Sequence, residues 1–190
     1  MELTHLLESC RSGDELAWEM LVRRYQSRIF GIAYSYVRDG DEARDLAQDI
    51  YVRIYRHLDA CKDPDRFLPW MIRLARNACI DHLRRRKARP PARDIPADEA
   101  LRLVSSDEAP DEELVRKERL RIVDLALDRL SRINREMILL KDMQGLSLED
   151  ISDMLGLPLG TVKSRSSRAR IELAKEVQRL LGPPVEEATA

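Results

Sequence analysis

Apolar residues recur every three or four positions along most of this chain, which is the spacing of one buried face on an α-helix. The first such segment runs from Leu16 to about Tyr36. Asp39-Gly40-Asp41 then breaks the pattern and offers an acidic start for a second helix, which reaches about Leu58. After a loop at 61–65, a third helix is expected to begin near Pro69, a residue suited to a first helical turn. The N-terminal part is therefore predicted to be a three-helix bundle.

The composition changes abruptly in the middle of the chain. Residues 84–93 hold six basic residues and no acid, whereas residues 94–114 hold eight acids against one base, with two prolines. Such a stretch predicts an extended linker, and the helical pattern that follows ends at Gly182-Pro183-Pro184. The predicted fold is all-α, with a helical domain at 1–88, a flexible acidic linker at 89–113, a second helical domain at 114–182 and a disordered tail at 183–190.

Overall charge and composition limit the kinds of partner and the cellular compartment that this chain can have. The 190 residues include 33 basic and 34 acidic side chains, a formal net charge of −1, so any nucleic-acid surface must be local. Three scattered cysteines fit a reducing compartment better than a disulfide scaffold. No uncharged stretch exceeds nine residues, well short of the ~20 that a membrane helix needs, and no secretion signal is visible. We expect a cytoplasmic protein with no membrane insertion.

The sharpest local signal lies in Leu146–Arg170. Ser147 followed by Asp150 resembles a capping box, which places a helix start there. Gly156-Leu157-Pro158 ends that helix, and the next helix is expected to open at Gly160-Thr161 with Thr161 as its cap. Two short helices joined by a tight turn form the helix-turn-helix pattern, whose second helix enters the major groove of DNA.

The second of these helices also has suitable chemistry. Lys163 and Ser167 are four residues apart, as are Ser164 and Arg168, so the four side chains share one face. Such a face offers donors to guanine edges and to phosphates, although a basic helix can also be an ordinary solvated one. From Thr161 to Lys175 this helix contains one acidic residue, Glu172, and five basic residues, which are Lys163, Arg165, Arg168, Arg170 and Lys175.

Two strings in the N-terminal part, Asp45–Tyr51 and Trp70–Arg86, resemble region 2 of the bacterial RNA polymerase sigma factors, most closely the extracytoplasmic-function (ECF) subgroup. Arg135–Leu140 and Gly160–Arg170 resemble region 4 of the same family. The resemblance covers nearly the whole chain apart from linker and termini. It implies a protein that binds core polymerase, directs it to promoters and opens the DNA. Because polymerase does the chemistry, no catalytic residue, metal or cofactor is expected.

The resemblance also assigns roles in region 2. The family's second region 2 helix docks on a coiled coil of the largest polymerase subunit. In the next segment a loop, here 60–67, takes a flipped base of the −10 element, and the helix after it contacts the melted DNA. The matching polymerase-binding positions are Asp45, Gln48, Asp49 and Tyr51, and the matching −10 positions are Trp70, Arg73, Arg76, Asn77, Arg84 and Arg85. Trp70 could be a buried anchor or could stack on DNA.

Region 4 corresponds to a reader of the −35 element that also touches the polymerase flap. The acidic linker matches a segment that threads toward the RNA exit path, where its charge could mimic nucleic acid. Small factors of this class are usually held inactive by an anti-sigma factor, often membrane-bound, so we expect such a partner. The base-facing positions are Lys163, Ser164, Ser167 and Arg168, and those expected to hold the DNA backbone are Arg135, Thr161 and Arg165.

Three positions depart from the family pattern. Ser131 follows Leu130 where Pro is usual, Ser152 replaces a common Ala, and Ser166 replaces a Leu of the recognition helix. We expect these changes to give a looser turn and a less tightly packed reading domain.

Two other interpretations remain open from the sequence. A stand-alone helix-turn-helix regulator would also bind duplex DNA, but the sequence shows neither a receiver domain nor a dimerising heptad. A zinc site is the other alternative, although Cys79 is more simply a small buried residue. Its four nominal ligands would be His57, Cys61, Cys79 and His82.

Overall fold

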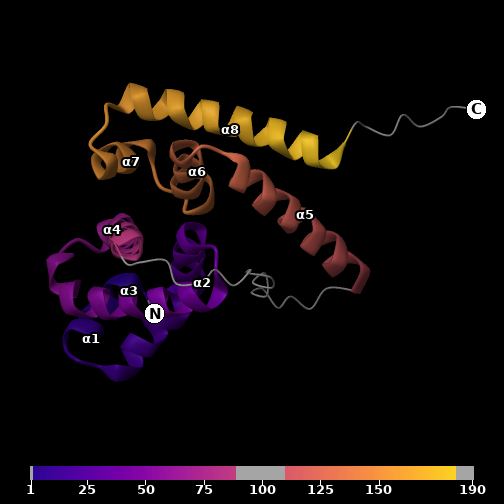
Figure 1. Cartoon of the computed structure of the whole chain (residues 1–190). Helices are drawn as coiled ribbons and strands as arrows, with labels where there is room; N and C mark the ends of the chain where they lie inside the picture. Colours follow the sequence, from indigo (N-terminus) through magenta and orange to yellow (C-terminus); the bar gives the residue numbers. More distant parts are fainter. Residues whose placement is uncertain (1, 89–109, 183–190) are drawn as a thin grey trace, which may run out of the picture. The chain divides into compact units, whose positions relative to one another are not determined.

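The structure, a computed structural model, describes residues 2–88 and 110–182, and the predicted tail and most of the predicted linker lie outside these residues. The chain divides between Arg102 and Leu103 into two compact units. Every regular element in the two described ranges is helical (Figure 1), which confirms the all-α class.

The first unit holds one helix more than the sequence pattern predicts. The extra helix, α1, packs against α2 and buries Leu6, Leu7 and Cys10. It spans only nine residues, too few for its periodicity to stand out. Two short 3-10 turns, Leu58–Ala60 and Pro64–Arg66, connect α3 to α4. The four helices are α1 (Leu3–Arg11), α2 (Glu15–Val37), α3 (Gly40–His57) and α4 (Phe67–Ala88).

Aspartates begin two of these helices. The Asp14 carboxylate accepts hydrogen bonds from the backbone N–H groups of Leu16 (2.9 Å) and Ala17 (3.2 Å), and the Asp39 carboxylate accepts one from the N–H of Glu42 at 2.8 Å. Such contacts satisfy backbone donors that have no partner within the helix. The helix start predicted at Asp39-Gly40-Asp41 is therefore confirmed.

The core of the first unit lies where α2, α3 and α4 meet. Phe67 is fully buried at the first residue of α4, two residues before the predicted start at Pro69, which falls in the first turn. Its ring centroid lies 5.4 Å from that of Tyr25 and 5.8 Å from that of Trp70. The largest other side chains buried here are Leu21, Ile29, Ile32, Leu46, Ile50, Ile54, Met71 and Ile72.

In the second unit α8 is the common support, because α5, α6 and α7 all pack on it. α5 begins at Pro110, four residues ahead of the predicted boundary at 114. α6 runs directly into a π-helical turn, Leu139–Met143, that buries Leu139 and Leu140. The helices of this unit are α5 (Pro110–Arg129), α6 (Arg132–Ile138), α7 (Leu148–Leu155) and α8 (Leu159–Leu181).

The helix-turn-helix boundaries are confirmed at α7 and differ at α8. The Ser147 hydroxyl accepts from the N–H of Asp150 at 2.9 Å and donates to its carboxylate at 2.6 Å, and Gly156 ends α7 in the left-handed conformation (φ 65°). The prediction that Thr161 caps the next helix was wrong. α8 begins at Leu159, and the N–H of Thr161 already donates to the Pro158 carbonyl at 2.8 Å, inside the first turn.

Two of the three unusual serines close turns. The Ser131 hydroxyl caps α6 by accepting from the N–H of Asn134 at 3.3 Å. The Ser152 hydroxyl donates to the Leu157 carbonyl at 2.5 Å and so holds the turn between α7 and α8. Each hydroxyl satisfies a backbone group at a chain reversal, while the looser turn expected at Ser131 stays a prediction. Ser166 is buried (6% exposed), a small side chain on the inner side of α8.

Candidate nucleic-acid interface

The outer face of α3 brings three of the four predicted polymerase-binding residues together. Asp45, Gln48 and Asp49 are exposed and follow one another at helical spacing. Val52 and Tyr55 continue the same face and are 47% and 59% exposed, unusual values for large apolar side chains. Sequence analysis missed both, although the three- and four-residue steps from Asp45 reach them. The exposed face of α3 is therefore acidic and polar at its start and apolar at its end.

Tyr51, the fourth predicted residue, lies apart from this face. Its hydroxyl donates to the Val22 carbonyl of α2 at 3.2 Å, and its ring meets that of Trp18 edge-on at 6.5 Å. Burial raises the pKa of the Tyr51 phenol, which stays protonated as a donor. Tyr51 thus fixes α3 on α2, while the exposed Tyr55 also packs edge-on against Trp18, at 5.1 Å.

Along α4, the −10 residues predicted from the sequence line one side. Trp70, Arg73, Asn77 and Arg84 are separated by three, four and seven residues, so their side chains leave the helix in similar directions. Arg73, Asn77 and Arg84 are exposed, while Trp70 is half-buried against Phe67. Trp70 is therefore partly anchored and partly accessible. Arg76 lies beside this line and is half-buried.

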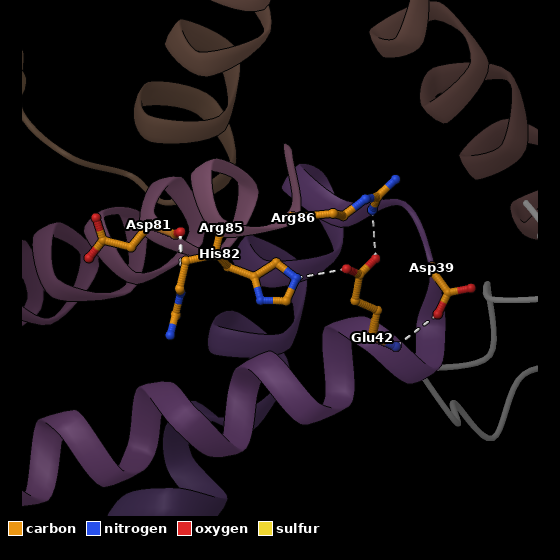
Figure 2. A network of polar contacts seen from close by, with 6 residues as sticks. All are labelled: Asp39, Glu42, Asp81, His82, Arg85 and Arg86. Atoms are coloured by element: carbon orange, nitrogen blue, oxygen red, sulfur yellow. Dashed lines mark hydrogen bonds and ion pairs between the residues drawn. The ribbon is translucent and has the colours of Figure 1, made fainter. Parts of the chain in front are cut away.

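A carboxylate from α3 divides the basic run at the end of α4 (Figure 2). Glu42 accepts from Arg86 Nη1 at 2.8 Å through one oxygen and lies 2.7 Å from His82 Nε2 through the other. Arg85 extends apart from this cluster, and its Nε donates to the Asp81 carbonyl of its own helix at 3.4 Å. Arg86 is thus held on α3, whereas Arg84 and Arg85 remain exposed without a carboxylate partner in the described part of the chain.

The loop before α4 is supported from the N-terminal helix. Arg11, the last residue of α1, donates a hydrogen bond to the Cys61 carbonyl. The Asp63 carboxylate accepts from the N–H of Asp65 at 3.0 Å and starts the second 3-10 turn. Because α1 was not predicted from the sequence, this role of Arg11 was missed as well.

The N-terminal half of α8 presents the predicted base-facing residues together. Lys163, Ser164, Ser167 and Arg168 are all exposed, and the guanidinium of Arg168 lies 3.5 Å from the Ser164 hydroxyl. The flanking residues Thr161 and Arg165 are half-buried. This end of α8 therefore offers a compact set of hydrogen-bond donors on a single face.

Arg135 is placed differently from the other predicted −35 residues. Its guanidinium donates to the Leu127 carbonyl at 2.8 Å and to the Asp128 carbonyl at 2.6 Å, near the end of α5. These carbonyls lie in the last turn of α5, where the helix dipole makes a cation favourable. Arg135 joins α6 to α5, and any contact with the DNA backbone would have to share this guanidinium.

The nominal zinc ligands do not form a cluster. No group of three or more His, Cys, Asp or Glu side chains suited to a metal ion occurs among the residues described. Cys79 is fully buried, and burial raises the pKa of its thiol to about 12. His82 is engaged by Glu42. None of the helices in the described ranges is long and apolar enough to cross a membrane.

Comparison with known protein families gives two matches. A model of sigma-70 region 2 matches residues 21–89, and a model of sigma-70 region 4 matches residues 120–173. The RNA polymerase sigma-H factor of Pseudomonas aeruginosa is 34% identical over 181 residues, covering 93% of this chain and 94% of that protein. The ECF RNA polymerase sigma-E factor of Escherichia coli K12 is also 34% identical over 181 residues, with coverage of 93% and 94%.

Two solved structures share the fold. RpoE from Bartonella quintana, in complex with the anti-sigma factor NepR, has a TM-score of 0.64 and 25% identity, covering 84% of this chain and 95% of that one. CnrH, in complex with the cytosolic domain of CnrY, has a TM-score of 0.60 and 27% identity, covering 90% and 93%.

Proposed function

We propose a residue-level mechanism on the premise that this chain belongs to the ECF group of the sigma-70 family of RNA polymerase sigma factors. The resemblance inferred from the sequence is confirmed, and so is the general function that it implied. The chain acts in transcription initiation, as the subunit that brings polymerase to its promoters. One observation supports the proposal: most of the positions named from the sequence on α3, α4 and α8 carry exposed polar or basic side chains.

Polymerase binding is assigned to the exposed face of α3. Asp45 and Asp49 supply negative charge and Gln48 supplies hydrogen bonds, while Val52 and Tyr55 add apolar area at the far end. A polar rim next to exposed apolar side chains is the usual composition of a protein interface. The partner is the coiled coil of the largest subunit, and the second unit would touch the flap.

Promoter opening is assigned to α4 and the loop before it. Extruding one base from the duplex costs a few kcal/mol, which stacking and hydrogen bonds in a pocket can recover. Trp70, which is partly accessible, and the exposed Arg73 and Asn77 lie along one side of α4, the helix that follows this loop. Arg84 and Arg85 would neutralise phosphates at the edge of the melted DNA, a contribution without sequence preference.

Reading of the −35 element is assigned to the first half of α8. Arg168 and Lys163 are exposed donors of the type that contacts guanine, and Ser164 and Ser167 are short donors between them. Thr161 and Arg165 lie at the flanks of this face, where phosphate contacts fix the register without reading bases.

Control by a separate anti-sigma protein is part of the proposal. Both similar structures above contain a bound second protein, and one of these is an anti-sigma factor by name. We infer that such a protein covers the exposed faces of this chain in the uninduced cell, and that the chain works in the cytoplasm with no chemistry of its own. Recovery of the native chain as a free monomer from uninduced cells would contradict this point.

The test is transcription with purified components. The chain is added to sigma-free core polymerase of its host, and run-off transcripts are measured over a library of genomic promoters. We expect initiation from a small set with shared upstream and downstream elements. Binding of the chain to DNA without retention by core polymerase would instead indicate a stand-alone regulator.

A charge reversal locates the polymerase contact. Asp49→Lys should abolish retention by core polymerase, because it places a cation in the middle of the acidic face. Glu8→Lys makes the same change at an exposed position of α1 and should leave retention intact. Equal retention of both variants would overturn the assignment of α3.

A further inference from the structure

One basic residue of the recognition helix is already paired. Lys163, Ser167 and Arg170 follow one another by four and three residues, so they line one edge of α8. At the end of this edge, Arg170 donates from Nε (3.0 Å) and Nη2 (2.5 Å) to a single oxygen of Asp142. Asp142 belongs to the π-helical turn that follows α6. The second unit therefore carries a carboxylate at the margin of its basic face.

The pairing sets Arg170 apart from its neighbours. Lys163 and Arg165 have no carboxylate partner in the part of the chain that the structure describes, and Arg168 contacts only a hydroxyl. The hydrogen bond and charge of Asp142 raise the pKa of Arg170 above its ordinary value. Both side chains are nevertheless accessible, with 56% and 32% of their surface exposed. An accessible pair of this kind is weak and can be exchanged for another partner.

A DNA phosphate is the natural alternative partner. Carboxylates and phosphates accept from the guanidinium fork in similar geometry, and a phosphate within the DNA chain offers two non-bridging acceptor oxygens. If α8 lies on a duplex with Lys163 and Ser167 toward the bases, Arg170, about one turn further along the helix, borders the phosphate backbone. Asp142 then competes for a cation that would otherwise add to non-specific binding.

We propose that Asp142 is an intramolecular competitor of DNA phosphate for Arg170, which lowers the affinity of the second unit for duplex DNA of arbitrary sequence. This inference rests on the proposed function, since it requires α8 to be the DNA-facing helix. Its consequence is a factor that binds genomic DNA weakly and relies on polymerase and on base contacts for promoter selection.

The test compares salt dependence for the full-length chain on a labelled duplex of random sequence, measured by fluorescence anisotropy between 50 and 200 mM salt. Each phosphate contact adds about 0.9 to the slope of log affinity against log salt. Asp142→Asn should bind more tightly and steepen the slope by about that amount, so that the ratio of affinities at the two salt concentrations rises about threefold. Asp142→Ala should show the same increase in affinity and in salt slope as Asp142→Asn. Circular dichroism checks that both variants keep their helices.

Two further variants isolate the pair. Asp142→Asn combined with Arg170→Ala should return to the value of Arg170→Ala alone. Glu118→Gln removes one exposed negative charge from α5 and should leave the slope unchanged. An unchanged or shallower slope in Asp142→Asn overturns the proposal. The proposal is also overturned if the double variant or Glu118→Gln steepens the slope as much as Asp142→Asn does, because the effect would then not depend on Arg170.

The outcome of this experiment can be distinguished from a failure of the proposed function. It contains no polymerase and no promoter, so loss of specific initiation would not change the comparison between variants. Conversely, a chain that initiates correctly can still show no effect of Asp142, which would remove this inference alone.

Discussion

Glu42, in the first turn of α3, accepts a hydrogen bond of 2.8 Å from Arg86, in the last turn of α4. The same carboxylate engages His82, one turn earlier on α4. Glu42 and Arg86 are 44 residues apart in sequence, and their contact closes the first unit at one end. It also gives one member of the basic run a carboxylate partner, although Arg86 stays 55% exposed.

Replacement of Glu42 tests this closure. Glu42→Gln should lower the free energy of unfolding by about 1 kcal/mol, since the carboxylate is only 26% exposed and loses two partners. Chemical denaturation with urea measures the change. Asp41→Asn is the matched control. The Asp41 side chain pairs with Arg44 but is 93% exposed, so loss of this ion pair should cost well under about 0.5 kcal/mol. A larger cost for Asp41→Asn would contradict this ranking.

The buried thiol of Cys79 predicts a loss of stability at high pH. Burial holds the pKa of this thiol at about 12 against an ordinary value of 9.0, so between these values the folded chain keeps a proton that the unfolded chain has released. Stability from this thiol is complete below pH 9 and declines as pH rises toward 12, by up to about 1.4 kcal/mol per pH unit.

The measurement is urea unfolding at pH 8 and at pH 10.5 with a reducing agent present. Tyr51 and the other cysteines contribute to the pH dependence with the same sign, so the comparison is made with Cys79→Ala. That variant is less stable at both pH values but should lose less between them than the wild type. Identical losses would show that Cys79 does not ionise in this range on unfolding.

Arg84 should contribute to promoter opening through phosphate contacts. Arg84→Ala is expected to weaken the complex of polymerase holoenzyme with its promoter and to reduce the salt slope by about 0.7–0.9, the value for one phosphate on single- or double-stranded DNA. Arg56→Ala removes an exposed cation near the end of α3 and serves as control. If both variants change the slope equally, the contribution is general charge and not a contact of α4.

Arg168 should read the upstream element. Arg168→Ala is expected to reduce discrimination between upstream sequences by about 1–3 kcal/mol if its contact is bidentate to guanine. Transcription from a library of upstream hexamers measures the preference. Lys175→Ala changes a cation two turns further along the same side of α8 and should weaken binding without altering the preferred sequence. An unchanged preference in Arg168→Ala would show that this side chain is not a reader.

Helical periodicity predicted most of the framework because it depends on residues that are close in sequence. Asp39, Ser147 and Gly156 marked element ends correctly, since caps act within one turn. The N-cap of α8 was misplaced by three residues, at Thr161 instead of Pro158, because the helix begins after Pro158 without any side-chain cap. α1 was missed because its stability comes from packing on α2, not from its own short pattern.

The sequence predicted which residues share an exposed helix face, but it did not predict the contacts that those residues make with other helices. Spacing alone placed Asp45, Gln48 and Asp49 together, but the inward turn of Tyr51 depends on Val22 and Trp18, which lie on another helix. The pairs of Glu42 with Arg86 and of Asp142 with Arg170 join residues 44 and 28 positions apart. No local pattern indicates such pairs, and they decide which cations of a basic run already have a carboxylate partner.

The hydrogen bond from Arg11 to the Cys61 carbonyl bears on how shortened versions of this protein should be designed. The match to region 2 begins at residue 21, so a fragment cut to that boundary would omit α1 entirely. It would expose the apolar surface that Leu6 and Leu7 cover and would remove the hydrogen bond that Arg11 donates to the loop before α4. Inhibitor screens or crystallisation trials run on such a fragment would sample a loop that the intact factor never presents.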